Sequence, residues 1–187
     1  MNLAINYKES IEYIQKKIKE ILNKVSQQEI DKVKDLFFNA NRIFVYGAGR
    51  SGLVAKAFAI RLVHLGFQTF VIGETITAPV QNGDLVVIVS GSGETIPAVM
   101  TAEIAHKLGA YVISITAKKT SEIAKFADVT LYIASTCYEN KRKKYAPLGT
   151  LFEASVWILF DGIIADLLNS KNETEEIMRS RHATLEH

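Results

Sequence analysis

Two short segments rich in glycine and serine are the residues of this chain best suited to hold an anion. The first reads Gly-Ala-Gly-Arg-Ser-Gly over residues 47–52, and the second reads Ser-Gly-Ser-Gly-Glu-Thr over residues 90–95. Each follows an apolar run typical of a strand and opens a stretch with helical periodicity. Free N–H groups at a helix N-terminus attract anions, and hydroxyl groups add further donors. The two segments therefore predict a site for a small anionic metabolite, and a sugar phosphate fits it best.

Both segments are expected to contact this ligand, mainly at its phosphate. The predicted binding residues are Gly49, Arg50, Ser51, Ser90, Gly91, Ser92, Gly93, Glu94 and Thr95.

The first segment also has the Gly-x-Gly-x-x-Gly spacing of a dinucleotide-binding loop. Such a fold places an acidic ribose ligand about 20 residues further on. Glu74 could take that role although it lies somewhat late, whereas Arg50 and Ser51 are suited to gripping an anion directly. A dinucleotide site would also leave the second donor-rich segment without a purpose, so we favour the phosphate site.

Three residues outside these segments could carry acid–base chemistry: Glu153, His64 and His182. Glu153 falls in the first turn of an expected apolar helix, so it is either half of a capping box with Thr150 or a general base among apolar side chains. His64 ends the helix expected after the first segment, where a histidine also suits the negative end of the helix dipole. His182 lies near the C-terminus, where it is either an inert tail residue or an acid that a docked tail presents.

The sequence shows no pattern for a metal or for a serine nucleophile. It has no closely spaced histidine pair, carboxylate-rich loop, cysteine cluster or Gly-x-Ser-x-Gly elbow. We therefore expect neither metal nor cofactor. Isomerisation of a phosphorylated sugar needs only a base that moves a proton between neighbouring carbons and an acid that polarises the carbonyl.

The elements that position these residues alternate between strand and helix from residue 43 onward. Strands are expected at 43–46, 67–72, 85–90, 110–115 and 128–133, with helices at 51–65, 94–108 and 121–126 between them. Continuously apolar strands joined by helices indicate a parallel sheet buried on both faces. The predicted fold class is α/β, a three-layer α/β/α sandwich with a five-stranded parallel sheet. Both glycine-rich segments then lie at the carboxyl ends of strands, where such sheets bind ligands.

Two helices precede this core and two follow it. The first two are expected at 6–23 and 27–39, the second of them with Ser26 and Glu29 as a capping box. A polar loop is expected at 135–147, then a long apolar helix at 150–169 and a charged helix at 173–181. We expect one domain over residues 1–187, with residues 1–40 as a helical extension and residues 41–187 as its core.

The composition narrows the range of partners. A net charge of +2 gives no overall field that would attract nucleic acid. Cys137 is the single cysteine, which fits a reducing cytoplasm, and the N-terminus has no signal-peptide pattern. The apolar stretch at 151–168 carries Glu153, Asp161 and Asp166, so we expect a buried helix rather than a membrane span.

The two glycine-rich segments resemble those of the SIS (sugar isomerase) domain family, from about Asn41 to the C-terminus. Four further segments are similar to the 6-phospho-3-hexuloisomerases within that family. They are Arg61-Leu62-Val63-His64-Leu65-Gly66-Phe67, Gly73-Glu74-Thr75-Ile76-Thr77, Pro147-Leu148-Gly149-Thr150-Leu151-Phe152-Glu153 and Arg181-His182-Ala183-Thr184-Leu185-Glu186.

This resemblance implies conversion of D-arabino-hex-3-ulose 6-phosphate to D-fructose 6-phosphate through an enediol, a step of formaldehyde fixation by the ribulose monophosphate pathway. It also implies a homotetramer with active sites at subunit contacts. We expect Glu153 to be the base and either His182, from a neighbouring subunit, or His64 to be the acid. Two alternatives stay open: another sugar-phosphate isomerase of the same family, or a non-catalytic sugar-phosphate sensor.

Overall fold

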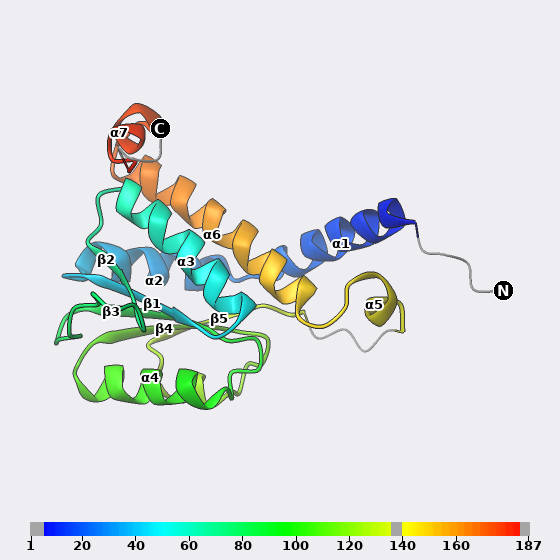
Figure 1. Cartoon of the computed structure of the whole chain (residues 1–187), viewed down its shortest axis with the longest axis horizontal. Coiled ribbons are helices and arrows are strands. Elements are labelled where there is room, and N and C mark those ends of the chain that lie inside the picture. The colour runs from blue at the N-terminus through cyan, green and yellow to red at the C-terminus, as the bar shows by residue number, and fades with distance from the viewer. Residues whose placement is uncertain (1–5, 136–139, 184–187) are drawn as a thin grey trace.

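Five parallel strands form one sheet with helices on both faces (Figure 1). The computed structural model describes residues 6–135 and 140–183. The strands are β1 (Ile43–Gly47), β2 (Thr69–Val71), β3 (Leu85–Val89), β4 (Tyr111–Thr116) and β5 (Val129–Tyr132). Their order across the sheet is β2-β1-β3-β4-β5, which is the flavodoxin-like order. The predicted three-layer sandwich is therefore confirmed.

Three helices cover one face of this sheet. They are α2 (Gln27–Asn39), α3 (Arg50–His64) and α6 (Thr150–Ser170), with α3 and α6 side by side above the strands (Figure 1). The N-terminal helix α1 (Tyr7–Leu22) packs against α6 and extends beyond the sheet (Figure 1). The opposite face carries α4 (Ile96–Lys107) and a single 3-10 turn at Ile123–Phe126. Two short helices complete the chain, α5 (Asn140–Tyr145) and α7 (Glu175–Ser180).

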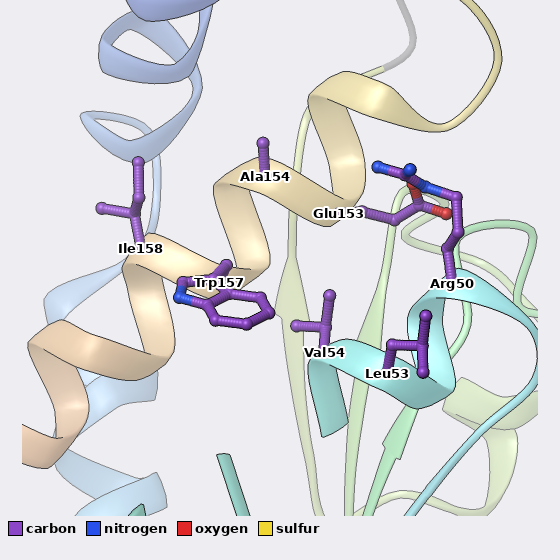
Figure 2. Close-up of a pocket in the computed structure, with 7 residues that line it drawn as sticks. All are labelled: Arg50, Leu53, Val54, Glu153, Ala154, Trp157 and Ile158. Atoms are coloured by element: carbon purple, nitrogen blue, oxygen red, sulfur yellow. The ribbon is translucent and has the colours of Figure 1, made fainter. Parts of the chain in front are cut away.

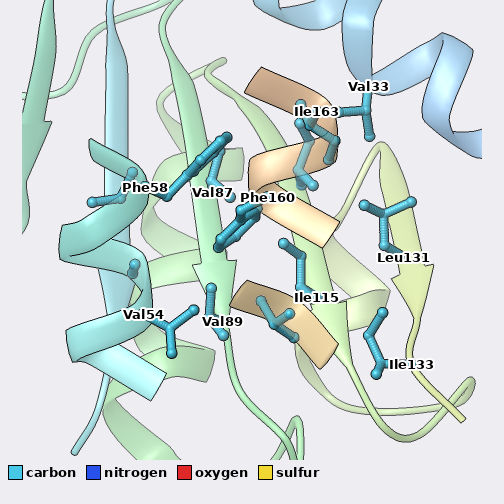
Figure 3. Close-up of a cluster of buried hydrophobic side chains, with 14 of the residues drawn as sticks. Val33, Val54, Phe58, Val87, Val89, Ile115, Leu131, Ile133, Phe160 and Ile163 are labelled. Atoms are coloured by element: carbon cyan, nitrogen blue, oxygen red, sulfur yellow. The ribbon is translucent and has the colours of Figure 1, made fainter. Parts of the chain in front are cut away.

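Alternate residues of the strands fill two separate cores, because successive side chains of a strand point to opposite faces. Towards α3 and α6 point Val45, Val87 and Ile113, and towards α4 point Phe44, Val86 and Val112. On the first side, Phe58 of α3 stacks on Phe160 of α6 with ring centroids 3.9 Å apart (Figure 3). Burial on both faces explains why the strands are apolar throughout. Because the strands are parallel, the glycine-rich segments that follow β1 and β3 emerge at the same edge of the sheet.

Some boundaries differ from the predicted ones. The prediction of a polar loop over residues 135–147 is wrong for residues 140–145, because they form α5. The α5 segment is anchored by tertiary contacts: the Tyr145 ring lies 5.5 Å from that of Tyr13, and Arg142 donates to the Leu148 carbonyl. Cys137 lies outside the described residues.

The other differences are smaller. The edge strand β2 is three residues long, α4 begins at Ile96, and the helix expected at 121–126 is only the 3-10 turn. Among the described residues, no helix has the length and apolar run needed to cross a membrane.

Candidate active site

The first glycine-rich loop joins β1 to α3 and lies at the carboxyl edge of the sheet. The first turn of α3 rests directly on the end of β1, since a Cβ on Gly47 would lie 2.8 Å from the backbone nitrogen of Gly52. Gly49 has a φ of +57° and takes the N-cap position. No described side chain caps α3. Close packing of helix on strand therefore accounts for the glycine spacing, and the N-terminus of α3 is presented to a ligand.

The second loop gathers three hydroxyl groups at the end of β3, the neighbour of β1. The Thr95 Oγ1 atom lies 3.4 Å from Ser90 Oγ and 3.3 Å from Ser92 Oγ. Backbone N–H groups within the loop donate to both serine oxygens, which fixes the serine side chains in place. Such a cluster offers several donors to the oxygen atoms of one phosphate. Glu94 pairs with Lys118 at 2.7 Å, which offsets its negative charge beside the loop.

Glu153 faces the first loop from the start of α6, where its carboxylate accepts a hydrogen bond from Arg50 Nε. The carboxylate side chain is 13% exposed, whereas that of Arg50 is 70% exposed. The capping-box interpretation is wrong, because Gly149 takes the N-cap position and Thr150 donates to the Pro147 carbonyl instead. The Glu153 carboxylate therefore pairs with Arg50 of the first loop while it lies against Gly149 at the start of its own helix.

The start of α6 also contacts the second loop. A Cβ on Gly91 would lie 3.2 Å from the ring of Phe152, the residue before Glu153. Both loops and the carboxylate thus meet over the ends of β1 and β3, where the strand order reverses and ligands bind in folds of this kind.

A hollow of about 440 Å³ lies beside this carboxylate between α3 and α6 (Figure 2). Arg50 and Glu153 are the charged residues of its lining; the others are Leu53, Val54, Ala154, Trp157 and Ile158. Trp157 is not among the site residues predicted from the sequence. Its position four residues after Glu153, on the same face of a helix, is the signal that points to it.

His64 and His182 lie together, but at the other end of α3. Their rings stack with centroids 4.4 Å apart, and His64 is buried. From Arg50 to His64 the helix rises about 21 Å along its axis. Within one copy of the chain, Glu153 therefore lies with the two loops, and His64 lies with His182. The histidine pair is at the opposite end of α3 from Glu153 and the loops.

The arrangement suits a phosphate next to a carboxylate. Hydroxyl groups and a helix N-terminus would face the phosphate of a ligand bound there, and Glu153 would face the remainder. Within the described part of the chain, no three His, Cys, Asp or Glu side chains come together as a metal site.

The fold and the site define a class of α/β protein with a candidate ligand site at the switch point of a parallel sheet. The sequence profile of the SIS domain family matches residues 36–140. The chain therefore belongs to the SIS domain family.

Its relatives include the 3-hexulose-6-phosphate isomerase of Bacillus subtilis, which is 38% identical over 94% of this chain and 98% of its own. The enzyme of that name from Methylomonas aminofaciens is also 38% identical, over 94% and 97% of the two chains. A solved structure from Methanococcus jannaschii, for which that activity was inferred, is 31% identical with a TM-score of 0.84 and covers 95% of this chain and 99% of its own.

Proposed function

We propose that this chain is a 3-hexulose-6-phosphate isomerase, the enzyme also called 6-phospho-3-hexuloisomerase. It interconverts D-arabino-hex-3-ulose 6-phosphate and D-fructose 6-phosphate. The observation that carries this proposal is the Glu153 carboxylate, held by Arg50 of the first glycine-rich loop beside the hydroxyl cluster of the second. The relatives of this name align over nearly the whole chain, which supports the same activity here.

The proposed chemistry is a proton transfer between C2 and C3 of the sugar. Ser51, Ser90, Ser92 and Thr95 hold the phosphate, with the backbone of both loops. Glu153 takes the proton from C2 of the 3-ketose, the electron pair forms a C2–C3 double bond, and the C3 oxygen gains a proton from the acid. Glu153 then returns its proton to C3 while the C2 hydroxyl gives its proton to the conjugate base of the acid, which leaves the carbonyl at C2 and restores the acid. One carboxylate on one face of a planar enediol serves both carbons.

The acid in this scheme is His182 or His64 of a second copy. In one copy, His64 lies about 21 Å along α3 from Arg50, which holds the carboxylate, and His182 stacks on His64. Both histidines are then too far from Glu153 to reach the same sugar. A second copy with its α3 antiparallel to the first would bring its histidines to the first copy's Glu153. The surface between α3 and α6 suits such a partner, because Leu53, Ile60 and Trp157 are 47% to 64% exposed there.

A second apolar surface supports the tetramer. On α4, Ile96, Met100, Ile104 and Leu108 recur every four residues and are 47% to 72% exposed. Helix α4 itself lies on the face of the sheet opposite α3 and α6 (Figure 1). Two separate apolar faces on one subunit fit two interfaces, as in a tetramer of dihedral symmetry. We propose that each chain of this tetramer is one domain. We further propose that the tetramer works in the cytoplasm and binds neither nucleic acid nor a membrane.

Solvent exchange tests the reaction. Fructose 6-phosphate incubated with the protein in deuterated water should gain deuterium at C3, because the enediol joins C2 and C3. An isomerase that joins C1 and C2 would label C1 instead. A sensor would bind the sugar phosphate and label neither carbon, and that result would overturn the proposal.

A further inference from the structure

The corner that follows α3 leaves one carbonyl for a partner from elsewhere in the chain. Phe67 N donates to the Leu62 carbonyl at 3.0 Å and Gly66 N to the Val63 carbonyl at 2.8 Å, which is a Schellman ending. The carbonyl of His64, the last residue of the helix, lies at the negative end of the helix dipole.

Arg181, from the C-terminal segment, occupies that position. Its Nη1 donates to the His64 carbonyl at 3.0 Å. The guanidinium also lies against Gly66, where a Cβ would be 3.0 Å from Cζ. Gly66 has a φ of +78°, so glycine serves both the turn and the close approach of the guanidinium.

Glu173 holds the same guanidinium from the other side. Its two oxygens accept from Nη1 and Nη2, the second at 3.2 Å, in the two-pronged geometry that arginine makes with a carboxylate. This pairing holds the pKa of Glu173 below its usual range and raises the pKa of Arg181. Lys171 lies 3.9 Å from the same carboxylate and over the ring of Phe67, so the corner is tied at several points.

The residue after Arg181 is His182, whose ring stacks on that of His64. The guanidinium therefore fixes the backbone beside His182 to the helix end that carries His64. We propose that Glu173 and Arg181 are positioning residues, which form a clasp that sets the His64–His182 stack in place for catalysis. This inference rests on the proposed function, because it takes this pair of imidazoles to supply the acid.

The clasp is tested with E173Q, which keeps the shape of the side chain and removes its charge. Turnover should fall about tenfold with KM for the sugar phosphate changed less than twofold, because the phosphate loops are remote from this corner. The turnover of R181K should fall by a similar factor, since an ammonium group cannot bridge Glu173 and the His64 carbonyl at once. The matched control is E175Q, which breaks the exposed Arg179–Glu175 pair on α7 and should keep wild-type turnover.

The histidine proton resonances give a readout that does not depend on turnover. The chain has four histidines, and H64N and H182N identify the two stacked rings by loss of a signal. In E173Q the ring-current shifts that each stacked ring imposes on the other should disappear, while the His106 signal stays in place. Thermal melts of E173Q and R181K confirm that the comparison is made on folded protein.

The outcomes separate the two proposals. Unchanged His64 and His182 signals in E173Q overturn the clasp, whether or not the protein is an isomerase. Displaced signals with full turnover also overturn it as a catalytic device. Wild-type protein that exchanges no proton of fructose 6-phosphate overturns the proposed function, and with it the catalytic purpose of the clasp.

Discussion

The pairing of Arg50 with Glu153 is the contact on which the proposed chemistry of this site rests. One partner is mostly exposed and belongs to a loop predicted to bind phosphate, while the other is mostly shielded at the start of α6. A single hydrogen bond through Nε holds the carboxylate towards the hollow. The exposed guanidinium can turn from this carboxylate to a phosphate, which would leave Glu153 free to accept a proton from carbon.

Replacing Glu153 with Gln removes the base and keeps the shape of the side chain. Turnover should fall by roughly 100-fold or more, with the sugar phosphate still bound. E103Q on the surface of α4 is the control, since its pair with Lys107 lies outside the site. Near-full turnover by E153Q, measured by deuterium exchange into fructose 6-phosphate, would contradict the assignment of the base.

Replacing Ser92 with Ala removes one hydroxyl of the cluster in the second loop. A hydrogen bond to a charged oxygen contributes about 1.5–3 kcal/mol, so the sugar phosphate should bind roughly tenfold or more weakly. T101A removes a hydroxyl that donates to a carbonyl of α4 and should bind the ligand normally. Calorimetric titration measures the affinity, and a thermal melt without ligand should show little change for S92A. An equal loss of stability without ligand would mean that Ser92 acts as a structural cap.

At the scale of elements, the strands and the helix ends that depend on local sequence pattern could mostly be predicted. Continuous apolar runs identified all five strands, and the Ser26 cap of α2 is present, with its Oγ accepting from Glu29 N at 3.3 Å. The loop sites followed from the same reasoning, because parallel strands bring their carboxyl ends to one edge. The order of strands, which makes β1 and β3 neighbours, placed the two loops side by side.

What local pattern could not supply were contacts between distant segments. Thr150 and Glu153 have the spacing of a capping box, but Arg50, about 100 residues earlier in the chain, takes the carboxylate. The stack of His64 on His182 joins the end of α3 to the segment after α7, and the Tyr145 ring of α5 lies beside that of Tyr13 in α1. Side-chain pairing across such separations is decided by tertiary packing, which no short window of sequence contains.

The pair of Glu173 and Arg181 should make stability depend on pH at the α6–α7 corner. Because Arg181 lowers the pKa of Glu173 in the folded protein, the stabilisation is present at neutral pH and is lost as the pH falls through that lowered pKa. The free energy of unfolding of wild type should therefore exceed that of E173Q at neutral pH. The gap should narrow below about pH 4, under the ordinary value for Glu.

Urea titrations of wild type and E173Q at several pH values measure this gap. E175Q should match wild type throughout, because the pair it breaks is exposed on α7. A gap of constant size into acid would show that the charge of Glu173 is not its source.

At the scale of the whole molecule, helices α4 and α6 both leave large apolar side chains exposed to solvent in a single copy of the chain. A helix that is apolar nearly all round is normally buried. On α6, Trp157 and Ile158 are 47% and 48% exposed beside the hollow, while the other side of the helix lies in the core. Glu153, the proposed base, lines the same hollow, so the copy that covers the helix would also complete the site.

Mixing two inactive variants tests whether the site is shared between copies. E153Q lacks the base and H182N lacks the candidate acid, so each alone should turn over slowly. If base and acid come from different copies, a mixed pair has one site with both groups intact and one site with neither. Random exchange of equal amounts, by mild denaturation and refolding together, should then recover about a quarter of wild-type activity. Mixing H64N with E153Q gives the same recovery if His64 is the acid instead. If both groups of a working site belong to one copy, every site in either mixture lacks one of them, and turnover should stay at the level of the separate variants.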